Sequence, residues 1–124
     1  MATLNDRVYD EGLSTLVSEA DRVDICGTEP TTYTEATSTY TLGNSTSVTL
    51  TGPAAGDTSG RKVTIPAISG ASVTGSGTAA YFALTDTTAS RLLATGSLSG
   101  GGQSVTSGNT FSLTAVDIEI PDPS

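Results

Sequence analysis

The apolar positions near the N-terminus repeat with the period of an α-helix. Between residues 5 and 21 they fall at i, i+4, i+7, i+8 and i+11, which is one helix face. These positions are Tyr9, Leu13, Leu16, Val17 and Ala20. Asn5 is suited to cap this helix, and Asp6 follows it in the first turn, beside the positive end of the helix dipole. Gly12 disfavours the helix by about 1 kcal/mol relative to Ala. The apolar spacing nevertheless predicts one amphipathic helix over 5–21.

After the helix the apolar positions alternate, as they do in β-strands. Arg22–Cys26 places Val23 and Ile25 on one side, and residues 31–46 are less regular, with one helical turn expected at Thr34–Thr37. From residue 47 short alternating segments lie between turn residues every 8–12 positions, and residues 53–60 and 98–102 are expected to be loops. The expected strands are 47–51, 61–65, 71–75, 78–85, 91–95, 103–106 and a last strand running from Phe111 to Ile120.

The last of these segments contains a phase slip. Phe111 and Leu113 share one parity, while Val116, Ile118 and Ile120 share the other. A β-bulge near residues 114–115 would restore the alternation. Turns at this spacing predict a mainly β fold, an antiparallel β-sandwich or jelly roll with one N-terminal α-helix. We expect one domain over 1–124, comprising the helix at 5–21, a connecting strand and loop at 22–46, and a β-sandwich at 47–121.

Composition indicates a thin hydrophobic core. Of the 124 residues 39 are Ser or Thr and 14 are Gly, whereas hydrophobic residues make up 35% and there is no Trp. Thr favours strands, and Ser and Gly favour turns. A small core makes association with neighbouring chains a favourable source of stability.

The charge is acidic and unevenly distributed. The formal net charge is −8, and residues 1–35 hold eight acidic side chains against two arginines. Such a chain repels phosphate backbones and anionic lipid surfaces, so we expect neither nucleic acid nor a membrane as a partner. No apolar stretch approaches the ~18 residues of a membrane span. The N-terminal residues lack the basic and apolar regions of a secretory signal, which predicts synthesis in the cytoplasm.

The residue types that perform catalysis are scarce. There is no His, which removes the commonest general base and metal ligand. Cys26 is the one cysteine, so an intramolecular disulfide is impossible. We interpret it as a small buried residue; an intermolecular thiol contact is the alternative. We therefore expect no enzyme, no catalytic residue and no cofactor.

The acidic side chains offer the remaining candidates. Asp117 and Glu119 lie two apart on one strand and share a face, which we expect to be solvated, like Asp21 and Asp24 at the exit of the helix. No calcium-loop pattern is present and no metal site is expected, which leaves open a calcium ion shared between subunits. Lys62 is expected to face solvent. The glycine-rich segments at 75–77 and 100–102 match no phosphate-binding motif.

Six segments of the chain carry a further signal. They are NDRV (5–8), ADRVDIC (20–26), EPTTY (29–33), VTGSGTAAYFALTD (73–86), RLLATG (91–96) and VTSGNTF (105–111). Together they resemble a group of small virion proteins of tailed bacteriophages. The resemblance covers most of the chain. It implies a β-sandwich subunit that acts by assembly in the virion, and it brings no catalytic residues with it.

The function expected from this resemblance is a capsid decoration or cement protein. The alternative is a tail, collar or fibre-associated structural protein, and a weaker one is a carbohydrate-binding adhesion module that would need an exposed aromatic platform. The expected partners are copies of the same chain, with a trimer favoured, and the major capsid protein or a tail or collar protein. The acidic N-terminal third is expected to meet a basic surface, which charge reversal at Asp21 and Asp24 would test.

Overall fold

Antiparallel strands dominate the computed structural model, which describes residues 4–46, 48–98 and 102–121. The helical elements are α1 (Asp6–Glu19) and the short π-helical η1 (Glu35–Thr39). The strands are β1 (Arg22–Cys26), β2 (Thr41–Ser45), β3 (Thr51–Ala55), β4 (Arg61–Ile65), β5 (Ile68–Val73), β6 (Gly77–Ala79), β7 (Tyr81–Asp86), β8 (Arg91–Ser97), β9 (Gln103–Val105), β10 (Thr110–Leu113) and β11 (Val116–Ile120). The expected mainly β fold with one N-terminal α-helix is confirmed.

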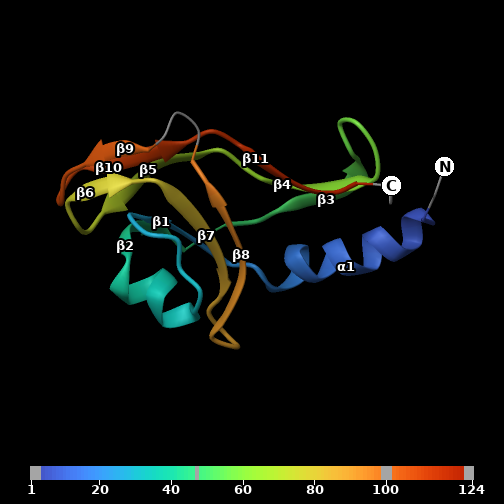
Figure 1. Cartoon of the computed structure of the whole chain (residues 1–124), viewed down its shortest axis with the longest axis horizontal. Coiled ribbons are helices and arrows are strands. Elements are labelled where there is room, and N and C mark those ends of the chain that lie inside the picture. Colours follow the sequence, from blue (N-terminus) through green and yellow to red (C-terminus); the bar gives the residue numbers. More distant parts are fainter. Residues whose placement is uncertain (1–3, 47, 99–101, 122–124) are drawn as a thin grey trace.

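The strands form three antiparallel sheets (Figure 1). Sheet A has six strands in the order β10-β5-β2-β1-β7-β8, sheet B has the order β11-β4-β3, and sheet C pairs β6 with β9. Apolar side chains of sheets A and B, among them Ile25 and Val63, meet in one buried cluster. This shared core makes the arrangement sandwich-like. Within the described residues no helix has the length and hydropathy needed to cross a bilayer.

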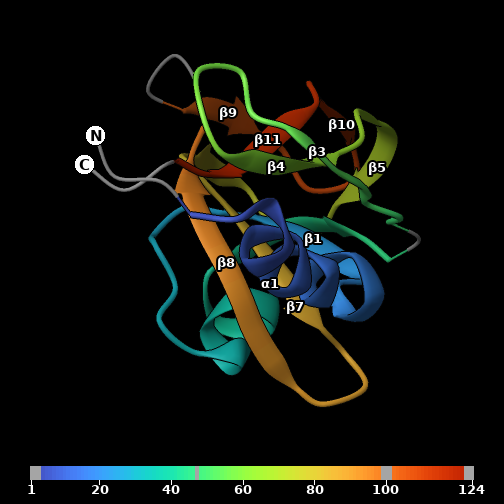
Figure 2. The same cartoon turned by 90° about the vertical axis from the view of Figure 1, so that its right-hand side faces the viewer.

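Helix α1 lies against β3 and β4 (Figure 2). The expected cap is present, since the Asn5 side chain accepts a hydrogen bond from the Arg7 N–H at 2.9 Å. Tyr9 and Leu13 are buried on the predicted apolar face. The helix is slightly shorter than expected because Ala20 is already extended. The chain thereby turns from α1 directly into β1.

Residues 22–46 contribute two inner strands of sheet A and do not merely connect the helix to it. β1 pairs with β2 on one side and β7 on the other, so sheet A begins at Arg22. Ile25 faces the main core, whereas Cys26 packs with Ala36 of η1 in a second small cluster. The helical turn expected at 34–37 is therefore present and covers the outer face of β1.

The strand expected at 47–51 is absent at residues 48–50, and the loop expected at 53–60 is confirmed only at residues 56–60. Val48 and Leu50 are buried but precede β3, which runs through Pro53; residue 47 lies outside the described part. β3 is an edge strand of sheet B, and its pairing with β4 is irregular between Thr51 and Ala54, where a proline that lacks an N–H is tolerated. Pairing with β4 makes residues 51–55 a strand, although their composition is typical of a turn.

Two expected strand boundaries are also wrong. The strand placed at 71–75 is β5 and begins at Ile68. The single strand expected over 78–85 is interrupted at Ala80, whose N–H donates to the Cys26 carbonyl at 2.9 Å. β6 then joins sheet C, while β7 joins sheet A. The strands expected at 61–65, 91–95 and 103–106 are confirmed as β4, β8 and β9, and residues 99–101 of the expected glycine-rich loop lie outside the described part.

The phase slip after Leu113 marks a change of sheet and not a bulge. β10 pairs with β5 in sheet A, whereas β11 pairs with β4 in sheet B. Between β10 and β11 the chain leaves sheet A and joins sheet B. The inward-facing residues therefore change from odd to even positions. Asp117 and Glu119 are consequently on the outer side of sheet B.

Candidate functional site

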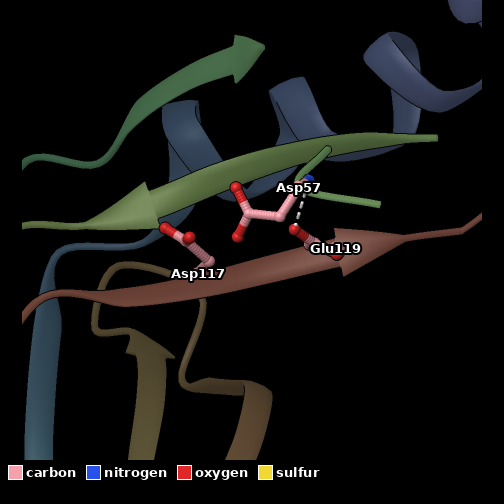
Figure 3. Close-up of side chains that lie close together, drawn as sticks. All are labelled: Asp57, Asp117 and Glu119. Carbon is pink, nitrogen blue, oxygen red and sulfur yellow. Dashed lines mark hydrogen bonds between the residues drawn. The ribbon is translucent and has the colours of Figure 1, made fainter. Parts of the chain in front are cut away.

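Three carboxylates meet on the outer side of sheet B (Figure 3). Asp117 and Glu119 come from β11, as their spacing predicts, and Asp57 comes from the turn between β3 and β4. One carboxylate oxygen from each lies within 4.8 Å of the others. The Asp57 N–H donates to Glu119 Oε1 at 2.8 Å, which fixes the turn against β11. Sequence spacing reveals the Asp117–Glu119 pair, but not Asp57, which is far from both along the chain.

Lys62 supplies the positive charge of this cluster. Its Nζ lies 2.7 Å from Asp57 Oδ1 and 3.0 Å from Asp117 Oδ2, so the ammonium bridges the turn and β11. These hydrogen bonds, the one to Asp57 first, raise the pKa of Lys62. Thus Lys62 does not simply face solvent as expected, because strand pairing places it opposite Glu119 and beside the two aspartates.

The pKa of Asp117 decides whether the cluster is suited to acid catalysis. The Thr64 hydroxyl donates to Asp117 Oδ1 at 2.7 Å, and this hydrogen bond, followed by Lys62, lowers the pKa of Asp117. A glycosidase acid needs the opposite shift, since it must hold a proton at neutral pH. The three oxygens are of the type that hard cations prefer, but a cation would have to displace the Lys62 ammonium. The cluster is best described as an ion-pair network that joins the β3–β4 turn, β4 and β11.

A groove of about 470 Å³ adjoins this network at the crossover from β10 to β11. Its described walls are residues 97–98, 102–103 and 112–117. Asp117 is the one ionisable side chain among them, and it is already engaged by Thr64 and Lys62. The described walls of the groove therefore combine small polar and apolar side chains and contain no acid–base pair.

Asp24, a carboxylate outside this cluster, is buried, although the sequence predicted a solvated position for it. Its side chain is fully buried, and Arg22 binds it through two hydrogen bonds, Nε to Oδ1 at 2.6 Å and Nη2 to Oδ2 at 2.9 Å. The Thr41 hydroxyl donates to Oδ2 at 2.6 Å, and Arg22 Nη2 also donates to the Thr37 carbonyl of η1. The hydrogen bond to Asp24 raises the pKa of Arg22. The i, i+2 spacing of Arg22 and Asp24 on one strand face was the available signal for this pair.

Cys26 is buried, as predicted. Its Sγ lies 3.6 Å from the Ala36 carbonyl oxygen, inside the small cluster between β1 and η1. Burial, together with the charge of Asp24, raises the pKa of Cys26 to about 12. The thiol therefore stays protonated at neutral pH and is shielded from a second chain.

The aromatic side chains do not form an exposed platform. All six lie in the described part; Tyr9, Phe82 and Phe111 are buried, and Tyr33, Tyr40 and Tyr81 are half-buried. Tyr40 and Tyr81 pack on the Cys26 cluster. Stacking on a sugar ring requires an accessible aromatic face, so this arrangement does not favour a carbohydrate-binding surface.

Comparison of the chain with models of protein families, with curated proteins and with solved structures found no match. The resemblance to virion proteins accordingly stays a prediction from sequence.

Proposed function

We propose that the chain is a structural protein of a tailed-bacteriophage virion that acts by assembly, with capsid decoration or cementing as its role. The sequence resemblance supports the place in the virion. The fold supports the mode of action through its unpaired strand edges, which are the observation that carries the proposal.

Sheets A and B each present two outer edges in the described part of the chain. Sheet A ends in β10 and β8, and sheet B ends in β11 and β3. The outer backbone groups of such strands can pair with a strand of a neighbouring chain. β8 is the longest described strand, with seven residues and no proline. A subunit of this kind gains stability from neighbours, as the thin core also favours.

The charge suits a basic partner surface, such as one on a capsid or tail protein. Among the acidic residues of the N-terminal third, Asp6, Glu11 and Glu29 are exposed. Asp24 is buried, so charge reversal there would disrupt the fold and would not probe docking. Glu29→Lys is the appropriate variant, and we expect it to weaken binding of the chain to particles.

The first experiment is the mass of the purified chain, measured by light scattering behind a sizing column. A mass of three chains would support a subunit for threefold capsid sites. A stable monomer would weaken that assignment and favour a subunit that orders only on the particle.

The decisive experiment uses particles of the phage or prophage that encodes the chain. We expect the chain in purified particles, labelling by gold-conjugated antibody over the capsid, and a loss of heat resistance of the capsid when the gene is deleted. Label over the tail or collar would move the assignment to a tail or collar protein. Absence of the chain from purified particles would overturn the proposal.

A further inference from the structure

The exposed large hydrophobic side chains of the described residues gather at one end of the molecule. They are Leu4, Val8 and Ile120, with 41%, 56% and 38% of their surfaces exposed. α1 begins and β11 ends at this end of the fold (Figure 1), where the Tyr9 hydroxyl donates to the Pro121 carbonyl at 3.4 Å. Exposed apolar side chains grouped in this way mark interaction surfaces.

Val8 projects from the side of α1 that faces away from the core. Tyr9 and Leu13 occupy the inward face, and α1 packs mainly against β3 and β4. Successive helix residues are about 100° apart, so Glu11 lies about 60° and Arg7 about 100° from Val8, both in the same direction. Val8 is therefore flanked on one side by a positive and a negative side chain.

Neither of these charged side chains forms an ion pair within the described part of the chain. Arg61 binds Asp10, and Arg22 binds Asp24, but among the residues that the structure describes no such partner occurs for Arg7 or Glu11. Within one helix Arg7 precedes Glu11 by four residues, which is the less favourable order for an intrahelical pair. Both charges are available to another molecule.

We propose that two copies of this chain associate through the exposed face of α1, with the two helices antiparallel across a two-fold axis. An antiparallel two-fold contact brings the same flank of each helix together in reversed order. When the two-fold axis passes α1 near residue 9, Arg7 of each copy lies opposite Glu11 of the other copy. The two Val8 side chains then meet beside the axis.

The charge pattern favours a second copy over a different partner. A uniformly basic or acidic surface would repel one of the two flanking charges, whereas the two-fold contact pairs both of them twice. The apolar area is small compared with the roughly 800 Å² per partner of a standard interface. The association is therefore weak and depends on concentration. It is independent of the position of the chain on a particle.

Sedimentation equilibrium over a range of protein concentrations tests the contact. The wild-type mass should rise from one chain to two, or from three to six where a trimer also forms. Arg7→Glu and Glu11→Arg each place like charges opposite one another and should weaken this step about tenfold or more. Glu29→Lys, an exposed charge outside α1, is the matched control and should leave the step unchanged.

Mixing the two single variants gives the sharpest result. Arg7→Glu carries acidic side chains at both positions, and Glu11→Arg carries basic side chains at both. Each acidic side chain of one variant then faces a basic side chain of the other, so the mixture should regain association that neither variant shows alone. The double variant Arg7→Glu/Glu11→Arg should also regain it. Circular dichroism of each variant checks that the fold is intact.

A wild-type chain that stays at one mass up to millimolar concentration would overturn the proposal. A rise from one chain to two, or from three to six, that Arg7→Glu leaves unchanged would overturn it as well. Loss of association in the single variants without recovery in the mixture would exclude the antiparallel pairing. None of these results bears on whether the chain is present in a virion.

Discussion

At the scale of single residues, the Arg22–Asp24 pair holds β1 against η1. Both side chains lie on the same face of β1 as Cys26, and η1 covers that face. Thr41 completes the hydrogen bonding of Asp24, and no buried side-chain nitrogen or oxygen among the described residues lacks a partner. A buried pair of this kind is costly to break from one side because it leaves the other charge uncompensated.

Asp24→Asn should therefore destabilise the protein. The variant keeps the shape of the side chain but leaves the Arg22 guanidinium, which is 18% exposed, without its counter-charge. We expect a loss of about 2–4 kcal/mol in the free energy of unfolding, measured by urea denaturation. Glu29→Gln at an exposed position should change it by less than about 0.5 kcal/mol. Equal effects of the two substitutions would contradict the role of Asp24.

Cys26 should be unreactive in the folded chain. Because its pKa is raised to about 12, the nucleophilic thiolate appears only as the pH approaches that value. A maleimide or disulfide reagent at neutral pH should modify the native protein orders of magnitude more slowly than the denatured protein. Rapid labelling under native conditions would show that Cys26 is accessible and would revive an intermolecular thiol contact.

At the scale of elements, the close approach of β2 to β5 depends on a glycine. A Cβ on Gly43 would lie 2.6 Å from the Ser72 carbonyl oxygen and 2.9 Å from Phe111 Cε1. Gly43 thus allows β2 to lie close to β5 beneath the Phe111 ring. On α1, by contrast, a Cβ on Gly12 would meet nothing within 4 Å.

These two glycines make a matched pair of variants. Gly43→Ala must push the β2 backbone away from Ser72, and we expect a loss of about 1–3 kcal/mol in unfolding free energy. Gly12→Ala should raise it by about 0.5–1 kcal/mol, because alanine favours a helix interior. Thermal and urea unfolding followed by circular dichroism measure both changes. A neutral Gly43→Ala would show that β2 and β5 are not so closely packed.

At the scale of the whole molecule, ion pairs join parts of the chain that are far apart in sequence. Arg61 binds Asp10 and ties α1 to sheet B, and Lys62 ties the β3–β4 turn to β11. The carboxylates that take part must stay ionised. Acidification is therefore expected to loosen these ties.

Asp117 allows the sign of this effect to be tested. Its pKa is lowered in the folded chain below the ordinary value of 3.8, so the ionised form stabilises the fold above that pH. This contribution is lost as the pH falls through the lowered pKa. Asp117→Asn should lower the urea midpoint at pH 7 and show a smaller further drop on acidification than the wild type. Thr64→Val, which removes the main donor to Asp117, should reduce the pH dependence in the same direction.

Local pattern was sufficient for elements whose signals lie within a few residues. The helix face from Tyr9 to Ala20, the Asn5 cap and the alternation of β1 and β4 follow from periodicity, because side-chain direction in a helix or strand repeats with fixed spacing. The shared face of Asp117 and Glu119 follows from the same rule. The fold class could be predicted for this reason.

Tertiary structure alone decided where those elements pair and which side of each is covered. Pro53 is accepted in β3 because the strand is an edge, and the slip after Leu113 is a change of sheet; both depend on neighbours distant in the chain. Asp24 is buried because η1 covers β1, and Asp57 reaches Glu119 because β4 pairs with β11. The sequence by itself determined the periods of the elements and the acidic charge of the chain. Burial and the ion-pair networks depend on long-range contacts, which short-range spacing does not encode.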